Sequence, residues 1–239
     1  LDGTTQWFSQ RLIHQPHAID TLVDRLAMVK AGLTSNEKPL GVYFLVGPTG
    51  VGKTYFAKLA AERLFGDASR MLRFDLSEYR GRFAIEKLVG SPHDKDREGL
   101  LTEAVRNQPF TVLLFDEFEK ADPEIYNLFL QILDEGRLTD ARGRTTDFRQ
   151  TIIFLTSNLG ASRTSVAPVG FGDLVHRSER FGDHVMNKLD EFFAPEFLNR
   201  LDDVVVFNPL SPSAMRRLVE IELAKTFTRR GFARHHLRA

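Results

Sequence analysis

The residues best suited to chemistry form a glycine-rich run with the pattern G-x-x-x-x-G-K-[ST]. Glycines let the backbone curl until its N–H groups point at phosphate oxygens, while Lys53 adds a point charge and the Thr54 hydroxyl ligates Mg²⁺. The predicted phosphate-binding residues are Gly47, Pro48, Thr49, Gly50, Val51, Gly52, Lys53 and Thr54. A chance glycine-rich turn is the alternative, but an apolar run before the motif and a helical pattern after it argue against that. The run therefore predicts a bound nucleoside triphosphate with Mg²⁺.

Two acids and an amide follow other apolar runs. Asp116 and Glu117 end the run 111–115, and Asn158 lies just beyond the run 151–156. Open parallel sheets bind ligands at the carboxyl ends of their strands. Asp116 is suited to hold Mg²⁺ together with Thr54, and Glu117 to orient or deprotonate the water that attacks the γ-phosphate. For the acids alone a solvated strand end is the better interpretation, but the phosphate loop upstream on a separate strand favours the catalytic one. Asn158 would lie beside the acids only if the two strands are neighbours.

Short apolar runs alternate with helical patterns along the chain, which is typical of an α/β fold with a parallel sheet. We predict five buried strands, at 42–46, 71–75, 111–115, 151–156 and 201–207. Helices are predicted from Pro16 and at 53–65, 78–89, 100–105, 122–136 and 185–193, with a last one opened by Ser211-Pro212. We expect a hairpin at 138–148, an exposed loop at 91–99 and the longest irregular segment at 160–183.

Length and composition restrict the classes of function. The chain has 239 residues, enough for one large domain with a small appendage. Lys+Arg and Asp+Glu are both 32, so there is no bulk electrostatic pull toward nucleic acid or an anionic membrane. There is no cysteine, which fits a reducing compartment, and the histidines show no ligand spacing for a structural metal. No apolar run reaches the length of a membrane span. The first residue is Leu1, so we expect a piece of a longer protein.

Three stretches carry a resemblance to a known family: GPTGVGKT, the block from LLFDEFEKADPEIYNLFLQILDEGRLTD to TSNLG, and FAPEFLNRLDDVVVFNPL. They resemble the second nucleotide-binding ring of the Clp family of AAA+ protein unfoldases and disaggregases, over nearly the whole chain from about Leu12. The resemblance implies a five-stranded parallel P-loop AAA+ domain flanked by helices at 1–209. It further implies that 210–239 begin a C-terminal helical small subdomain.

The same resemblance assigns roles to residues. It makes Lys53 and Thr54 the phosphate-loop pair, Asp116 and Glu117 the Mg²⁺ and hydrolysis acids, and Asn158 the γ-phosphate sensor. It makes Arg200 an arginine finger that reaches the ATP of a neighbouring subunit in a ring, usually a hexamer. A surface salt bridge is the simpler alternative for Arg200.

The chain differs from the family pattern in three ways. The loop 91–99 is shorter than the family's aromatic pore loop and holds no aromatic residue, so its charged side chains are poorly suited to gripping a polypeptide. The family's Ile-Gly-Gln near the adenine appears as Ile13-His14-Gln15. Ile13, with Trp7, Phe8 and Leu12, either walls an adenine pocket or packs in the core. The family's further ATP-sensing arginine belongs to a segment beyond Ala239.

The leading hypothesis is a cytoplasmic, ATP-hydrolysing, protein-remodelling motor of the Clp type. Its expected partners are copies of itself in a ring, protein substrates, and an adaptor or peptidase, with no membrane. The alternative is an ATP-driven assembly switch that rearranges one partner without threading it. A nucleic-acid-dependent motor is a weaker third hypothesis, because the balanced charge and the family wording both argue against it.

Overall fold

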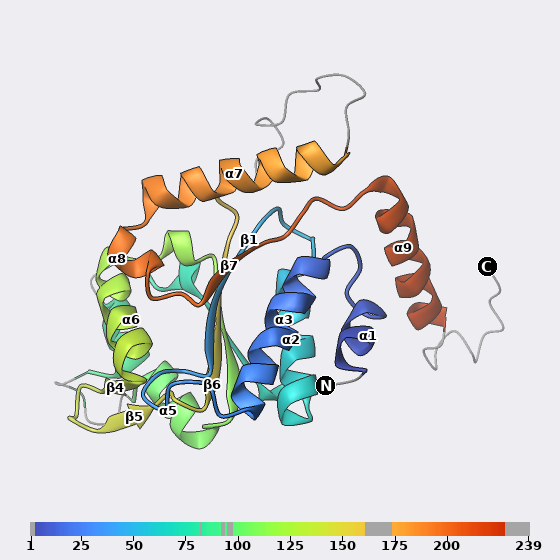
Figure 1. Cartoon of the computed structure of the whole chain (residues 1–239). Helices are drawn as coiled ribbons and strands as arrows, with labels where there is room; N and C mark the ends of the chain where they lie inside the picture. Colours follow the sequence, from blue (N-terminus) through green and yellow to red (C-terminus); the bar gives the residue numbers. More distant parts are fainter. Residues whose placement is uncertain (1–2, 82, 92–93, 95–97, 161–173, 228–239) are drawn as a thin grey trace.

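The computed structural model describes residues 3–81, 83–91, 94, 98–160 and 174–227, and its centre is a parallel sheet (Figure 1). Five strands are hydrogen-bonded in the order β2-β3-β6-β1-β7, all in parallel register. Their bounds are β1 Gly41–Val46, β2 Met71–Asp75, β3 Thr111–Asp116, β6 Thr151–Ser157 and β7 Asp203–Val206. The predicted five-stranded parallel sheet is confirmed, and β6 lies between the strand before the glycine-rich loop and the strand before the acids.

Helices cover both faces of this sheet. Their bounds are α1 Thr4–Ser9, α2 Pro16–Lys30, α3 Lys53–Phe65, α4 Ala84–Val89, α5 Leu100–Asn107, α6 Pro123–Glu135, α7 Leu174–Phe192, α8 Pro195–Leu198 and α9 Pro212–Phe227. Short 3₁₀ turns are η1 Ala68–Arg70, η2 Leu76–Glu78 and η3 Phe118–Lys120. One apolar cluster joins α1, α2 and α3 to one face, and a second joins α4 to α8 to the other. In Figure 1, α1, α2 and α3 stand to the right of the strands and α6 and α8 to the left, with α7 above them.

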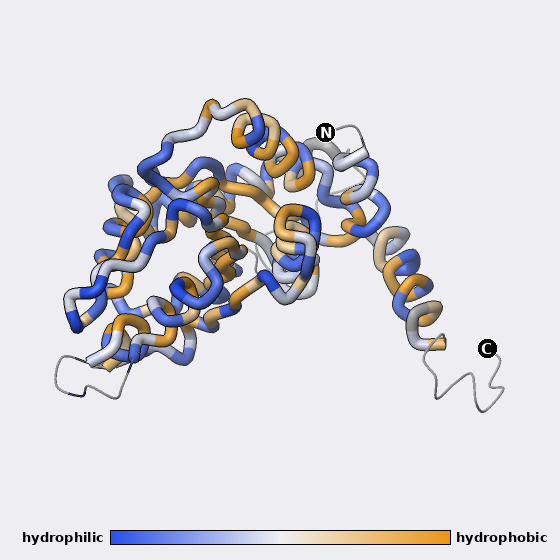
Figure 2. Tube along the Cα trace, turned by 90° about the horizontal axis from the view of Figure 1, so that it is seen from below, coloured by the Kyte–Doolittle hydropathy of each residue, from blue (hydrophilic) through white to orange (hydrophobic). Residues whose placement is uncertain are grey.

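The alternation of side chains along each strand explains the two clusters. Tyr43 and Leu45 point into the α1–α3 cluster, whereas Val42 and Phe44 point into the other, because neighbouring strand residues face opposite ways. In Figure 2 the trace through the middle of the molecule is mostly hydrophobic, whereas the outer loops are mostly hydrophilic. A sheet buried on both faces produces continuous apolar strands, which is why the strands could be predicted.

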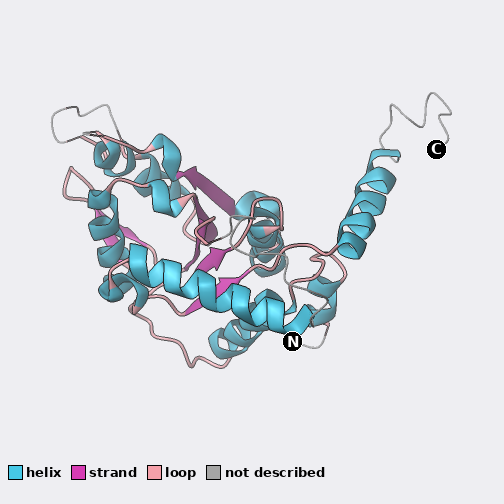
Figure 3. Cartoon of the chain, turned by 90° about the horizontal axis from the view of Figure 1, so that it is seen from above, coloured by secondary structure: helices cyan, strands magenta, loops and turns pink. Residues whose placement is uncertain are grey.

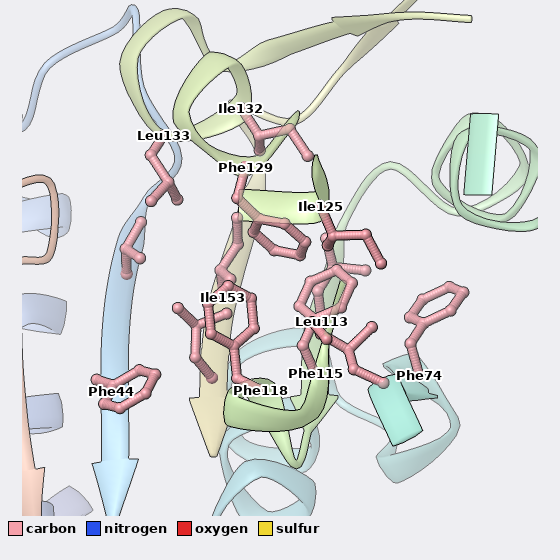
Figure 4. Packing of buried hydrophobic residues seen from close by; sticks show 14 of the residues in the cluster. Phe44, Phe74, Leu113, Phe115, Phe118, Ile125, Phe129, Ile132, Leu133 and Ile153 are labelled. Atoms are coloured by element: carbon pink, nitrogen blue, oxygen red, sulfur yellow. The ribbon is translucent and has the colours of Figure 1, made fainter. Parts of the chain in front are cut away.

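Helix α6 lies along the sheet and runs opposite to the strands. Its Phe129 ring packs edge-on against Phe115 of β3, with ring centroids 4.6 Å apart. In Figure 4, Ile132 and Leu133 lie where the strands begin, and Phe118 lies toward the arrowheads. Burying each large apolar side chain contributes about 1.5–3 kcal/mol. The helix is therefore held firmly, with its first turn near the carboxyl edge of the sheet and its last turn near the amino edge.

The structure corrects two predicted element bounds. Helix α7 begins at Leu174, inside the segment 160–183 that we predicted to be irregular, while 161–173 lie outside the described residues. Its buried residues Phe181, Val185 and Leu189 share one face, and this spacing outweighs the polar composition. The helix predicted at 78–89 starts only at Ala84, because Gly81 adopts a left-handed φ of 77° that interrupts it.

The predicted hairpin is confirmed as β4 Arg137–Thr139 paired antiparallel with β5 Thr145–Asp147. The loop 91–99 is only partly described. Its ends are tied by a bridge between Gly90 and Glu98, and Ser91 is buried, so this part is less exposed than predicted.

Helix α9 begins at Pro212, as predicted, and projects from the rest of the molecule (Figure 3). Its Met215, Val219 and Leu223 are about half exposed. The assignment of 210–239 to a separate small subdomain remains a prediction, and 228–239 lie outside the described residues. Among the helices that the structure describes, none is long and apolar enough to cross a membrane.

Candidate active site at the carboxyl edge of the sheet

The glycine-rich loop connects β1 to α3, and its backbone needs glycine. Gly47, Gly50 and Gly52 have φ values of 152°, 80° and 107°. A Cβ on Gly47 would lie 2.3 Å from the backbone oxygen of Phe207, so no larger residue fits there. Gly52 is the N-cap of α3, and no side chain caps the first turn. The first N–H groups of α3 are therefore suited to bind an anion, as expected for a phosphate-binding loop.

Lys53 links this loop to the end of β6. Its ammonium donates to the carbonyl oxygens of Gly47 and Pro48, the latter at 3.0 Å, and to Asn158 Oδ1 at 2.9 Å. Burial lowers the pKa of Lys53 to about 8, although the charges of Asp116 and Glu119 act in the opposite direction. An ammonium has three N–H donors. A phosphate that binds Lys53 therefore competes with these three acceptors, one of which is the predicted sensor.

Asp116 is held between two side chains that the sequence did not single out. Its Oδ2 accepts from Arg73 Nη2 of β2 at 2.7 Å, and its Oδ1 accepts from the Thr156 hydroxyl of β6. The same hydroxyl accepts the backbone N–H of Glu117 at 3.2 Å. Thr156 thus fixes both acids of the predicted pair relative to β6. This contact exists only because β3 and β6 are neighbouring strands in the folded sheet. No local sequence pattern could therefore have predicted it.

Glu117 has an unusual backbone for a residue with a side chain. Its φ is 54°, in the left-handed region, which costs about 1–2 kcal/mol for a non-glycine residue. Its Oε2 lies 2.5 Å from Lys120 Nζ. Strained backbone positions are concentrated at active sites, where the surrounding structure compensates for them. In this structure the carboxylate is half buried and paired, so it must leave Lys120 to act on a water.

Asn158 and Glu119 complete the group. The backbone N–H of Asn158 donates to Glu119 Oε1 at 3.1 Å, and Glu119 Oε2 is buried with no hydrogen-bond partner among the described residues. The η3 turn returns Glu119 toward Lys53, on which its charge acts. The structure therefore brings together Lys53, Asp116, Glu117 and Asn158, with Glu119 as a further acid that the sequence reasoning missed.

The oxygen donors of Thr54 and Asp116 fit Mg²⁺. Mg²⁺ is usually bound by one or two protein oxygens together with water and substrate phosphates, not by a complete protein cage. Thr54 is in the first turn of α3, and the Asp116 carboxylate is oriented by Thr156 and Arg73. In the part of the chain that the structure describes, no group of three or more His, Cys, Asp or Glu could hold a metal by itself. By this rule, water and nucleotide phosphates would provide the remaining ligands of the metal.

The segment before α2 also reaches the loop. A Cβ on Gly52 would lie 3.3 Å from Leu12 Cδ1, and Gln15 exchanges two hydrogen bonds with the backbone of Asn208. Leu12 is buried in the apolar cluster of the α1–α3 face, while the predicted base contact Ile13 is partly buried. Leu12 thus packs in the core and borders the loop, while a role of this segment as the wall of an adenine pocket stays a prediction. The contact of Ile13 with a base remains a prediction.

Arg200 is not part of this group. It follows α8, and its Nε lies 2.6 Å from Asp134 Oδ2 in the last turn of α6. Because α6, about 20 Å long, runs from the carboxyl edge to the amino edge, this pair lies at the edge opposite the glycine-rich loop. A hollow of about 510 Å³ lies at the same amino edge and is lined in part by Asp134. It is not the nucleotide site, because none of its lining residues belongs to the phosphate-binding loop.

Comparison with known proteins decides the family. Residues 38–204 match the model of the AAA domain (Cdc48 subfamily), which is more than half of the chain. The chaperone protein ClpB of Corynebacterium diphtheriae is 45% identical over 219 residues, and that of Aquifex aeolicus is 40% identical over 220. The chain belongs to the Clp family of AAA+ ATPases.

The solved structures agree with this assignment. This Clp-type chain superposes on the Hsp104–ADP complex of S. cerevisiae with a TM-score of 0.83 and 34% identity, covering 95% of this chain and 39% of that one. A closed state of Hsp104 with ATPyS and FITC casein matches equally well. The two ClpB matches each cover 90% of this chain, but only 24% and 22% of the relatives themselves. The resemblance and the fold class are confirmed, whereas the chain spans about a quarter of the curated relatives.

Proposed function

We propose that this Clp-type domain hydrolyses ATP with Mg²⁺ and forms part of a ring, usually a hexamer, that remodels protein substrates. The observation that carries the proposal is the division of the site between two edges of the sheet. Lys53, Asp116, Glu117 and Asn158 converge at the carboxyl edge, whereas Arg200 pairs with Asp134 at the amino edge. An arginine that serves this chemistry from there must serve a neighbouring subunit.

Each residue has a role that its contacts support. Lys53 and the first turn of α3 bind the phosphates, and Thr54 and Asp116 provide oxygen ligands for Mg²⁺, which neutralises charge on the β- and γ-phosphates when bound. Glu117 leaves Lys120 and orients or deprotonates the attacking water. Asn158, once released by Lys53, donates its amide to the γ-phosphate or the water. Arg200 of the next subunit stabilises the charge of the transition state, an effect of about 10³–10⁵ in rate for such arginines.

The names of the relatives favour protein remodelling over a dedicated assembly switch. The curated relatives are called chaperones, and one solved neighbour is described with FITC casein. We infer protein substrates for the parent protein, in the cytoplasm, with an adaptor or a peptidase as further partners. Because the loop 91–99 has no aromatic residue, we propose that the grip on the substrate comes from elsewhere in the assembly.

The test is ATP turnover and the unfolding of a stably folded reporter, measured in one reaction with the full-length protein. Glu117→Gln should keep nucleotide affinity and reduce turnover by about 10²–10⁴, the usual contribution of a general base. Unfolding of the reporter should stop with it. Glu124→Gln is the matched control, since Glu124 is an exposed acid in the first turn of α6. Unchanged turnover in Glu117→Gln would refute the catalytic assignment, and a reporter that stays folded while ATP is consumed would refute the remodelling.

A further inference from the structure

The guanidinium of Arg200 is held by a small set of contacts on one side. Its Nε donates to Asp134 Oδ2 at 2.6 Å, and its Nη1 donates to the backbone oxygen of Glu196 at 3.2 Å. Nη2 lies 3.7 Å from Glu196 Oε1, too far for a hydrogen bond. A guanidinium has five N–H donors. Among the described residues, the hydrogen bonds to this group therefore use Nε and one N–H of Nη1, and the other donors of the fork have no hydrogen-bond partner.

In the ion pair between Arg200 and Asp134, Asp134 is the residue held in place by the core. It lies in the last turn of α6, directly after Ile132 and Leu133, which are buried against the sheet. Arg200 follows the short helix α8, and its side chain would otherwise have about 2 kcal/mol of rotamer entropy. The contact thus ties a long, adaptable side chain to a helix whose neighbouring residues are buried against the sheet. Because Nε is the donor nearest the backbone, its bond to Asp134 leaves Nη2, at the far end of the guanidinium, without a hydrogen bond to the described part of the chain.

We propose that Asp134 is a positioning residue for Arg200, which orients the guanidinium fork toward the nucleotide of the neighbouring subunit. The inference rests on the proposed role of Arg200 in trans and adds the residue that prepares it. Asp134 touches neither nucleotide nor water in this scheme and acts only through Arg200. Its neighbour Lys38, with Nζ 3.9 Å from Asp134 Oδ1, partly balances the carboxylate when Arg200 engages a phosphate.

The experiment uses the assembled full-length protein and four variants: Asp134→Ala, Arg200→Ala, the double variant, and Glu135→Gln as the matched control. Glu135 is next to Asp134 on the same helix end but pairs with Arg137 at 2.9 Å. We expect Arg200→Ala to reduce the maximal rate of ATP turnover by about 10³–10⁵. Asp134→Ala should reduce it by about tenfold to hundredfold, the size expected for a misplaced catalytic group, with unchanged nucleotide affinity. The double variant should equal Arg200→Ala, and Glu135→Gln should equal the wild type.

The outcomes separate this inference from the proposed function. If Arg200→Ala turns over ATP normally, the role of Arg200 in trans is wrong and the inference is overturned with it. Suppose instead that ATP turnover is slow in Arg200→Ala but normal in assembled Asp134→Ala, or that it is much slower in the double variant than in Arg200→Ala. In either case only the inference is overturned. Should Asp134→Ala fail to assemble, Asp134→Asn decides, because it keeps the shape and an acceptor oxygen but loses the charge. A reduced rate in assembled Asp134→Asn supports the inference, and failure of this variant to assemble would overturn it.

Discussion

The lowered pKa of Lys53 makes the affinity for ATP sensitive to pH in the mildly alkaline range. Without nucleotide, burial lowers the pKa of the ammonium to about 8, despite the nearby charges of Asp116 and Glu119. A bound triphosphate adds several negative charges beside Lys53 and holds it protonated, so the pKa in the complex is higher. Binding therefore requires the uptake of a proton wherever free Lys53 is neutral. The affinity should fall as the pH rises through about 8.

The magnitude follows from the pKa. With a pKa of about 8, free Lys53 is about three-quarters protonated at pH 7.5 and about one-tenth protonated at pH 9. The apparent Kd for ATP should therefore rise about eightfold over this interval, or about 1.2 kcal/mol. The phosphates of ATP are already ionised across the interval and contribute little to the slope.

Fluorescent-nucleotide titrations at constant Mg²⁺ and ionic strength would measure this change. Lys53→Arg keeps its positive charge throughout, so the affinity that it retains should not depend on pH. Lys58→Met, which removes an exposed lysine from the same helix, should keep the wild-type slope. A wild-type Kd that is constant between pH 7.5 and 9, or a Lys53→Arg variant that weakens as steeply, would refute the reasoning.

Two further predictions concern stability, each measured by urea unfolding. Thr156→Val removes the hydroxyl shared by Asp116 and the N–H of Glu117, so it should lower the free energy of unfolding by about 2–4 kcal/mol, whereas Thr156→Ser should lower it far less. A loss below about 0.5 kcal/mol would contradict the bridging role. Burial raises the pKa of Asp140, but hydrogen bonds from Arg106 and from the backbone and side chain of Arg144 outweigh it and hold that pKa well below its ordinary value. The stability that Asp140 contributes is therefore present above about pH 4 and is lost on acidification below it. Asp140→Asn should lower the free energy of unfolding by about 3 kcal/mol at pH 7. It should also make that free energy fall less on acidification than in the wild type. If the pH dependence of the free energy of unfolding were unchanged in this variant, the assignment would be contradicted.

Much of the candidate site could be predicted because its signals are local. The glycines at 47, 50 and 52 are required by backbone angles within the loop itself, and the acids follow directly on a buried strand. The apolar strands were recognisable since both faces of the sheet are covered. The part of helix α7 before residue 185 was missed because its buried face is spread among polar residues, so the composition of 160–183 hid the periodicity.

The sequence by itself determined the family, the order of strands and helices along the chain, and the position of the glycine-rich loop between β1 and α3, because each depends on neighbours a few positions apart. Only the tertiary structure decided which strands pair. The insertion of β6 between β1 and β3 brings Asn158 to Lys53 and Thr156 to Asp116, over separations of 105 and 40 residues. It also decided that Arg200 meets Asp134 at the opposite edge, away from the site it is proposed to serve. Hydrogen bonds between strands and ion pairs between distant segments depend on the packing of the whole sheet, and no local pattern encodes them.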